Sequence, residues 1–184
     1  MPRVVVIDSC VLYSATLRDL FLRLAWSGFF SVRWSDRILE EMVRALVRTR
    51  PDIPVERLER LRATMRNAFS LAMVAPAGLD PIGLPDPDDE HVVAVAVASS
   101  ADHLVTLNVR DFPGEVVGRI TNARVVTPDE LLLALLAEDP AVVHFVVTAM
   151  AADLRNPPLT PERLLEGLRA QAPRFVEAYG RARR

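Results

Sequence analysis

The sequence predicts an α/β sandwich built around a mainly parallel sheet, followed by a C-terminal helical extension. Two observations carry this prediction. Over the first two-thirds of the chain, short apolar segments that suit strands alternate with longer segments of helical periodicity. The remaining third carries repeated helix-start signals. The chain has 184 residues, of which 51% are hydrophobic, so its length suits one domain with a sizeable core.

Four segments have the composition of strands. "RVVVID" (3–8) is a β-branched run that ends on an aspartate and is typical of a buried strand. The other three are "FFSVRW" (29–34), "HLVTL" (103–107) and "ARVVT" (123–127). Ligands of open parallel sheets bind beyond the carboxyl ends of the strands. Residues that directly follow these strands are therefore the first candidates for a functional site.

The segments between the strands show helical periodicity. Gly28 ends the first of these helices, and Ser35 is a candidate N-cap for the second. Pro51 and Pro54 end the second helix, and a loop rich in proline and glycine precedes the fourth. The four expected helices cover residues 17–28, 36–50, 55–73 and 89–100.

Three helix starts of one kind lie in the last third of the chain. "TPDE" (127–130) is a capping box with proline at the first helical position. "DP" (139–140) and "TPE" (160–162) repeat the pattern of a capping residue followed by proline. We therefore expect one domain over residues 1–127 and a helical extension over 128–184 that packs on it.

The overall charge does not identify a binding partner. The formal net charge is −2, so bulk charge does not indicate a nucleic-acid-binding protein. All basic residues are arginine, and between Arg33 and Arg66 nine arginines face six acids. Genomic codon bias explains an arginine-only composition, but arginine also suits bidentate phosphate contacts. Candidates for such contacts are Arg44, Arg48, Arg110 and the C-terminal arginines Arg181, Arg183 and Arg184.

Cysteine usage and the N-terminus predict a cytoplasmic protein. Cys10 is the single cysteine, which excludes an internal disulfide and a cysteine-based zinc site. Arg3 precedes only four apolar residues before Asp8, which is too short for a signal peptide. No apolar run approaches membrane-spanning length, so we expect no membrane partner.

Acidic residues concentrate at the ends of the predicted elements. Asp8 ends the first strand, and its carboxylate is either an N-cap of the next helix or a ligand. Glu41 borders the apolar stripe of its helix, whereas Glu40 points toward the arginines. A cluster of four acids precedes the fourth helix, and a further aspartate follows the third strand. These are Asp86, Asp88, Asp89 and Glu90, and Asp111.

Helix N-termini favour one or two acids, but four within five residues repel one another. A hard cation would relieve that repulsion. Because the available donors are all oxygen atoms, the sequence predicts Mg²⁺ or Mn²⁺. The three histidines lack zinc-type spacing, and His91 is expected to be structural although it lies close to Asp89 in sequence. There is no glycine-rich phosphate loop and no nucleophile elbow.

Three stretches together resemble the PIN-domain nucleases, and in style the VapC-like toxins of bacterial toxin–antitoxin modules. They are "VVVIDSCVLYSATLRDL", "RWSDRILEEMVRAL" and "DPDDEHVVAVAVASSADHLVTLNVRDFP". The resemblance covers residues 3–127 and rests on the joint order and spacing of short motifs. It implies a three-layer α/β/α fold and an acidic cluster that binds Mg²⁺ or Mn²⁺ and cleaves RNA.

Carried over residue by residue, the resemblance gives four positions that both ligate metal and act in catalysis: Asp8, Glu41, Asp89 and Asp111. Secondary positions are Asp86, Asp88, Thr106 and Asn108. Asn108 stands where many relatives have an aspartate, which removes one negative charge and puts a second metal ion in doubt. Thr106 resembles a small hydroxyl residue that hydrogen-bonds a ligand carboxylate or the phosphate. Substrate-binding residues remain unassigned.

Other functions fit less well. A haloacid-dehalogenase-like phosphatase or a phosphorylated receiver domain also places an aspartate after the first strand, but each requires a lysine that this chain lacks. A weakened PIN domain that binds RNA or protein without cleavage is the alternative that stays open, because of Asn108. The expected partners are RNA, a cognate antitoxin protein and a second copy of the chain. The sequence does not choose a role for the C-terminal helices.

Overall fold

The computed structural model describes residues 3–154 and 159–182, so the terminal Arg183 and Arg184 lie outside the described residues. A four-stranded sheet has the order β2-β1-β3-β4, and every pairing in it is parallel. The strands are β1 (Arg3–Ile7), β2 (Phe30–Arg33), β3 (His103–Val105) and β4 (Arg124–Val126). The expected parallel sheet is therefore confirmed, although all four strands are shorter than the sequence pattern indicated.

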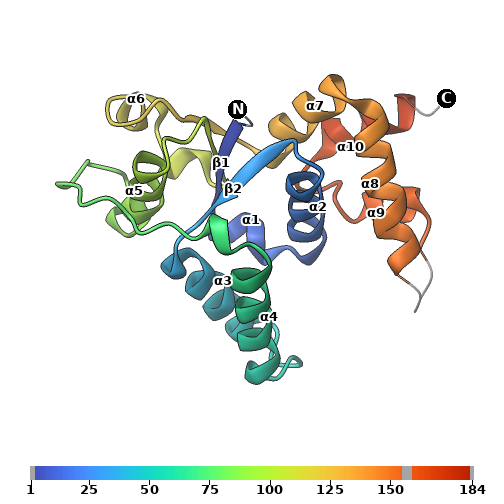
Figure 1. Ribbon diagram of the computed structural model, residues 1–184, viewed down its shortest axis with the longest axis horizontal. Helices are drawn as coiled ribbons and strands as arrows, with labels where there is room; N and C mark the ends of the chain where they lie inside the picture. The colour runs from blue at the N-terminus through green and yellow to red at the C-terminus, as the bar shows by residue number, and fades with distance from the viewer. Residues whose placement is uncertain (1–2, 155–158, 183–184) are drawn as a thin grey trace.

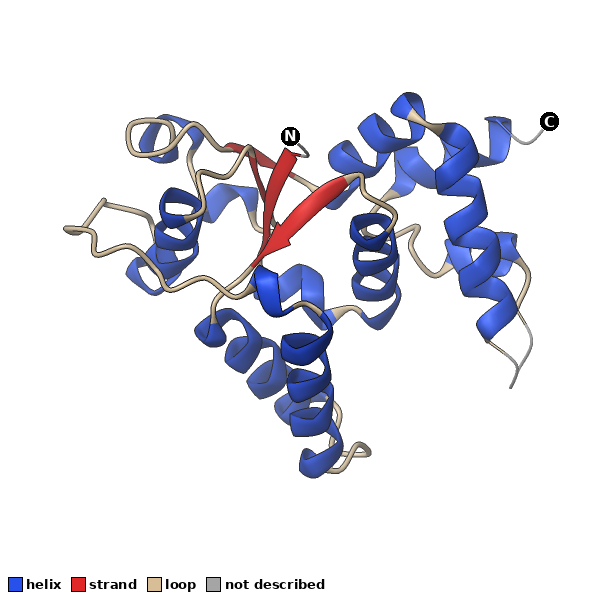
Figure 2. Cartoon of the chain, in the orientation of Figure 1, coloured by secondary structure: helices blue, strands red, loops and turns tan. Residues whose placement is uncertain are grey.

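Helices cover the sheet on both sides. The first two-thirds of the chain contain α1 (Ser9–Tyr13), α2 (Ala15–Trp26), α3 (Asp36–Thr49), α4 (Val55–Ala68), α5 (Glu90–Ala98) and α6 (Gly114–Val117). Figure 1 shows α5 and α6 on one side of the sheet and α2 with the C-terminal helices on the other. Figure 2 shows how small the sheet is beside its helical layers. This arrangement is the expected α/β/α sandwich.

The start of α2 lies earlier than expected, and a separate short helix precedes it. Residues 9–13 form α1, whose five residues are too few to produce a helical period that can be recognised in sequence. Gly28 adopts a φ of +89°, which glycine tolerates better than other residues, and thereby ends α2 as predicted. The chain then turns directly into β2.

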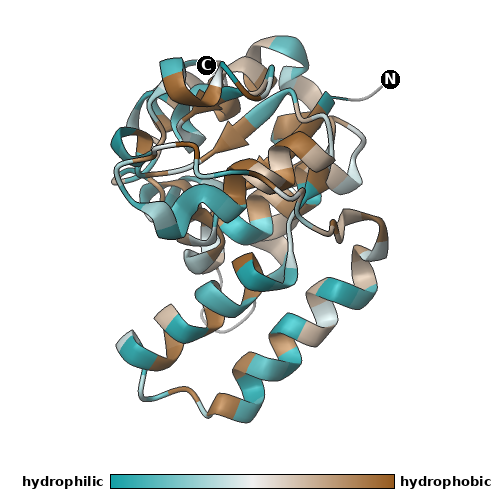
Figure 3. Ribbon diagram, turned by 90° about the vertical axis from the view of Figure 1, so that its left-hand side faces the viewer, coloured by the Kyte–Doolittle hydropathy of each residue, from teal (hydrophilic) through white to brown (hydrophobic). Residues whose placement is uncertain are grey.

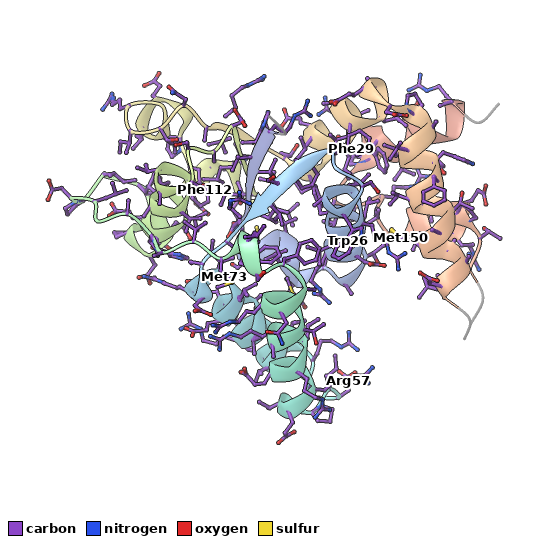
Figure 4. The ribbon with its side chains drawn as sticks, in the orientation of Figure 1. Trp26, Phe29, Arg57, Met73, Phe112 and Met150 are labelled. Atoms are coloured by element: carbon purple, nitrogen blue, oxygen red, sulfur yellow. The ribbon has the colours of Figure 1, made fainter. Side chains whose placement is uncertain are left out.

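The expected helix over residues 55–73 is wrong in its last turn. Helix α4 ends at Ala68, and a short 3₁₀ helix, η1 (Ser70–Ala72), follows it. The helix must end here because the residues that follow pair with Trp34 and so extend the open edge of the sheet beside β2. The backbone N–H of Trp34 donates to Ala72 O at 3.0 Å, and that of Val74 donates to Trp34 O at 2.9 Å. Figure 4 shows Met73 at this junction between sheet and hairpin.

Helices α3 and α4 form a hairpin that projects from the rest of the molecule. Figure 3 shows hydrophilic and hydrophobic residues alternating along both helices. Ser35 caps α3 by accepting a hydrogen bond from Ile38 N at 3.3 Å, as predicted. Arg62 of α4 joins the two helices through Glu40 at 2.7 Å and Asp36 at 3.3 Å. Glu40 therefore faces the arginines of α4, also as predicted.

The C-terminal helices are α7 (Pro128–Glu138), α8 (Pro140–Asp153), α9 (Pro161–Glu166) and α10 (Pro173–Ala182). Three of them, α7, α8 and α9, begin where the capping patterns predicted, whereas α10 was not predicted. Thr127 and Glu130 form the expected capping box, and Asp139 and Thr160 cap the next two helices through their side chains. Helix α8 packs against α2. Within the described ranges no single helix is long and apolar enough to cross a membrane, and α7 with α8 meets that criterion only as a pair bent by 118°.

A buried aspartate fixes the position of α10. Asp129, which is 6% exposed, accepts a hydrogen bond from Phe175 N at 2.8 Å and pairs with Arg174 Nε at 2.7 Å. Replacing Asp129 with alanine is expected to lower the free energy of unfolding by about 2 kcal/mol, because it leaves a buried N–H group without an acceptor. Urea denaturation measures this change.

The matched control is Asp153→Ala, which removes a solvent-exposed pair with Arg23 at 2.8 Å. It should cost less than about 1 kcal/mol. Equal losses for the two variants would contradict the role assigned to Asp129.

Candidate functional site

The site lies at the carboxyl ends of β1 and β3, the two central strands. Asp8 directly follows β1, and Thr106 directly follows β3. Because the strands are parallel neighbours, both residues reach the same edge of the sheet. The backbone N–H of Asp8 donates to Val105 O at 3.0 Å, which fixes Asp8 relative to β3. In Figure 1 this edge is the one from which α1 begins and the α3–α4 hairpin projects.

The Asp8 carboxylate is buried and held by neighbouring hydroxyl and thiol groups. It is 5% exposed. Its Oδ2 accepts hydrogen bonds from Thr106 Oγ1 at 2.7 Å and Cys10 Sγ at 3.0 Å, and its Oδ1 accepts one from Ser9 Oγ at 3.2 Å. Asp8 occupies the N-cap position of α1, but its side chain makes no capping hydrogen bond. The N-cap interpretation therefore does not account for this carboxylate.

Cys10 acts as a donor to Asp8. Burial and the negative charge of Asp8 raise the pKa of the Cys10 thiol to about 12. The thiol therefore stays protonated at neutral pH and is a poor nucleophile. Leu107 N donates to Cys10 Sγ at 3.3 Å, which ties the thiol to the loop after β3.

Glu41 reaches the site from the first half of α3. Its Oε1 lies 2.9 Å from His91 Nε2, 3.2 Å from Arg37 Nε and 3.7 Å from Arg44 Nη2. The His91 contact is short but poorly aligned, so we treat it as electrostatic rather than as a hydrogen bond. Burial raises the pKa of Glu41, but the contacts with His91 and Arg37 outweigh it and lower the pKa overall. Glu41 is therefore ionised at neutral pH.

Asp89 is the centre of the acidic cluster. Burial and four neighbouring carboxylates raise the pKa of Asp89 to about 6. These carboxylates belong to Asp8, Asp86, Asp111 and Glu41. These carboxylates come from the end of β1, from α3 and from two loops, so elements distant in sequence bring negative charge to bear on Asp89.

Asp111 enters the site through a short 3₁₀ helix, η3 (Val109–Asp111). The next residue, Phe112, is 1% exposed and anchors this turn in the core, as Figure 4 shows. Asn108 begins the turn, and its backbone N–H donates to Thr106 Oγ1 at 3.0 Å. The side chain of Asn108 is exposed and forms no hydrogen bond with any residue in 3–154 or 159–182.

The four acids before α5 have separate roles. Asp86 accepts a hydrogen bond from Asp88 N at 2.9 Å and caps the 3₁₀ helix η2 (Pro87–Asp89). Asp88 is exposed and contacts Arg37 rather than the centre of the site. Glu90 Oε1 accepts hydrogen bonds from the backbone of Ile82 and Gly83 and so holds the preceding loop. Of the four, Asp89 faces the cluster most directly.

The carboxylate oxygen atoms are of the kind that binds a hard divalent cation, but they do not surround a single ion position. Every carboxylate at the site offers oxygen ligands, which Mg²⁺ and Mn²⁺ prefer. The raised pKa of Asp89 shows that negative charge accumulates here. Among the described residues, however, no three His, Cys, Asp or Glu side chains are spaced as a bound ion requires.

Two residues of the site were not predicted. Arg37 donates from Nη2 to Asp88 O at 3.0 Å while Nε contacts Glu41, so it joins α3 to the acidic loop. The spacing of four residues between Arg37 and Glu41 on a helix signals this pair. His91, expected to be structural, is nearly buried and adjoins Glu41. No local pattern in the sequence indicates that contact, because α3 and α5 meet only in the folded chain.

Comparison with known proteins adds independent information. A family model described as the PIN domain matches residues 4–110, and one described as the VapC50 C-terminal domain matches residues 128–181. A Mycobacterium tuberculosis protein with the name "Putative ribonuclease VapC50" is 33% identical over 88 residues, which cover 48% of this chain and 52% of that protein. The chain thus spans about half the length of the curated relative it matches. No solved structure matches.

Proposed function

Because this chain belongs to the PIN-domain family, we propose that it is a divalent-metal-dependent endoribonuclease, a toxin of a toxin–antitoxin pair. One observation supports the proposal: burial, together with carboxylates from β1, α3 and two loops, raises the pKa of Asp89 to about 6. Without a cation, the repulsion between these negative charges destabilises the folded protein. With a cation bound, the same carboxylates serve as its ligands. The printed name of the M. tuberculosis relative supports RNA as the substrate.

In this proposal Asp8, Glu41, Asp89 and Asp111 hold Mg²⁺ or Mn²⁺. When bound, the ion supplies a water molecule of lowered pKa and stabilises charge on the phosphoryl oxygens. Asp86 is placed to add an outer carboxylate, since its charge acts on Asp89. Asp88 and the exposed Asn108 stay at the periphery of the site.

The surrounding residues orient the proposed ligands. Thr106 and Cys10 donate to Oδ2 of Asp8 and leave Oδ1 with a single long contact from Ser9. Arg37 and His91 both contact Oε1 of Glu41. Oε2 of Glu41 accepts no hydrogen bond within the part of the chain that the structure describes, so it is the oxygen available to a cation.

We further propose a cytoplasmic protein with a cognate antitoxin and a homodimeric state. The VapC50 C-terminal domain match supports a shared architecture with that relative. Phe145 of α8 is 69% exposed and Leu154 beyond it is 43% exposed, which suits a covered surface in an assembly. Size-exclusion chromatography with light scattering measures the oligomeric state.

Removal of metal tests the proposed reaction. Protein treated with EDTA should lose cleavage of single-stranded RNA completely, and addition of Mn²⁺ or Mg²⁺ should restore it, because the ion supplies the nucleophilic water. The readout is gel analysis of end-labelled RNA. As a control, the same treatment should leave the circular dichroism spectrum unchanged.

The same measurement separates the alternative function. A weakened PIN domain that only binds RNA or protein is favoured by Asn108 and by the absence, among the described residues, of carboxylates that surround a single ion position. RNA binding that EDTA does not affect, together with no cleavage at any metal concentration, would replace the nuclease with such a binding module.

A further inference from the structure

A second concave surface lies away from the acidic cluster. A groove of about 830 Å³ runs between the α3–α4 hairpin, the start of α2 and the turn before α10. Arg50 at the end of α3 and Arg57 near the start of α4 line it, and Gln171 from the C-terminal helices closes one side. Figure 4 shows Arg57 at the far end of the projecting hairpin. The groove therefore combines residues of both family matches.

The groove is strongly basic. Four arginines and one aspartate line it: Arg18, Arg50, Arg57, Arg60 and Asp52. Arg50 is committed to Asp52 through two contacts of 2.9 and 2.7 Å. Arg18 is committed to the end of α1, because its Nη1 donates to the carbonyl oxygens of Leu12 and Tyr13. Both guanidinium groups are therefore already engaged in contacts within the protein.

The two remaining arginines are available. Arg57 and Arg60 form no ion pair or side-chain hydrogen bond with any residue in 3–154 or 159–182. They lie about one turn apart on α4, so both guanidinium groups can reach one phosphate. The groove thus offers two unpaired guanidinium groups to an anionic ligand.

The rest of the groove requires more than a phosphate. Gln171 lines the groove, but its Oε1 is itself buried and accepts no hydrogen bond from the described residues, so a ligand in the groove does not reach that atom. Ile53, Leu58 and Leu61 form an apolar wall beside it. The ligand that satisfies both the unpaired arginines and the apolar wall has an anionic group and a flat apolar body.

We propose that this groove binds a nucleotide. Its phosphate pairs with Arg57 and Arg60, and its base packs on the apolar wall. The nucleotide is either free or part of an RNA strand, and the second source rests on the proposed ribonuclease function. Arg50 lies nine residues beyond Glu41 on α3, or about 14 Å. An RNA strand crosses that distance with about four stacked nucleotides.

The test measures binding in EDTA, so that it does not depend on cleavage. Isothermal titration compares the four nucleoside monophosphates with inorganic phosphate, and fluorescence anisotropy follows a labelled RNA of about 12 nucleotides. At least one nucleotide ligand should bind about tenfold more tightly than phosphate. The double variant Arg57→Gln/Arg60→Gln should lose about tenfold in affinity for it, because two charge-assisted contacts disappear.

Matched variants make the outcome decisive. Arg119→Gln removes an exposed arginine just beyond α6, a helix that Figure 1 shows apart from the α3–α4 hairpin, and should leave nucleotide affinity unchanged. Loss of mononucleotide binding in the double variant with RNA affinity unchanged identifies a free nucleotide as the ligand. Loss of RNA affinity alone identifies a nucleotide of the substrate strand.

The proposal is overturned if the double variant and Arg119→Gln behave alike, or if phosphate binds as tightly as every nucleotide ligand. Because all measurements are made without metal, a protein that fails to cleave RNA still gives a clear answer about the groove. Circular dichroism of each variant confirms that the hairpin remains folded.

Discussion

Replacing Asp8 with asparagine should lower metal-dependent RNA cleavage by about 10³-fold or more. The carboxylate is buried at the end of the central strand and oriented by Thr106 and Cys10, so its loss removes the best-fixed of the proposed oxygen ligands. A bound ion contributes several kcal/mol to such a reaction, and about 4 kcal/mol corresponds to about 10³ in rate. Initial rates with end-labelled RNA and saturating Mn²⁺ measure the effect.

Glu40 and Glu41 provide a matched pair for the same assay. Glu41→Gln should also abolish cleavage, because Glu41 adjoins His91 and the acidic cluster. Glu40→Gln changes the neighbouring residue in the same way but affects only a contact with Arg62 on the other side of α3. It should retain at least about half of the activity, since exposed ion pairs contribute little. Equal losses from the two glutamates, or full activity of Asp8→Asn, would contradict the assigned site.

Replacing Asp89 with asparagine should stabilise the metal-free protein and abolish its response to metal. The pKa of Asp89 is raised to about 6 in the folded chain, so ionisation of this residue opposes folding at neutral pH. After allowance for its partial exposure to solvent, removal of the charge should raise the free energy of unfolding by about 1 kcal/mol. Wild-type protein should gain thermal stability from Mn²⁺ by mass action, whereas Asp89→Asn should not.

The pH dependence of this gain follows from the direction of the shift. A carboxyl whose folded pKa is raised stabilises the folded chain below its unfolded pKa, near 3.8, and that stabilisation is lost as pH rises to about 6. The advantage of Asp89→Asn should thus be absent near pH 3.8 and complete above pH 6. Thermal unfolding in EDTA across this range measures it, with the exposed loop variant Asp80→Asn as control. If Asp89→Asn were less stable than the wild-type protein at pH 7.5, the inferred repulsion between carboxylates at this site would be refuted.

The parallel sheet explains how much of the site the sequence predicts. Asp8 and Thr106 directly follow β-branched runs, and the carboxyl ends of neighbouring parallel strands must coincide. Asp111 precedes the buried Phe112, so its loop is held where the apolar residue requires it. These placements follow from local patterns combined with one rule of topology, and for that reason sequence alone indicates them.

Contacts between helices that are far apart in the sequence cannot be predicted from local patterns in the same way. His91 of α5 meets Glu41 of α3 through packing, and no periodicity of either helix records the partner. The groove beside Arg57 likewise depends on where the C-terminal helices place Gln171. Glu90 appears in sequence as one acid among four, yet its carboxylate is bound to loop backbone, a role set by the path of residues 82–83.

The two contacts of the Arg37 guanidinium group limit which residues can replace this arginine. One nitrogen contacts Glu41 on its own helix while another donates to the carbonyl oxygen of Asp88, 51 residues away in sequence. Lysine has the same charge but concentrates it at one compact ammonium group, which cannot serve both partners with a fixed planar geometry. In a protein with 22 arginines and no lysine, the usual exchange between the two residues is therefore far from neutral at this position.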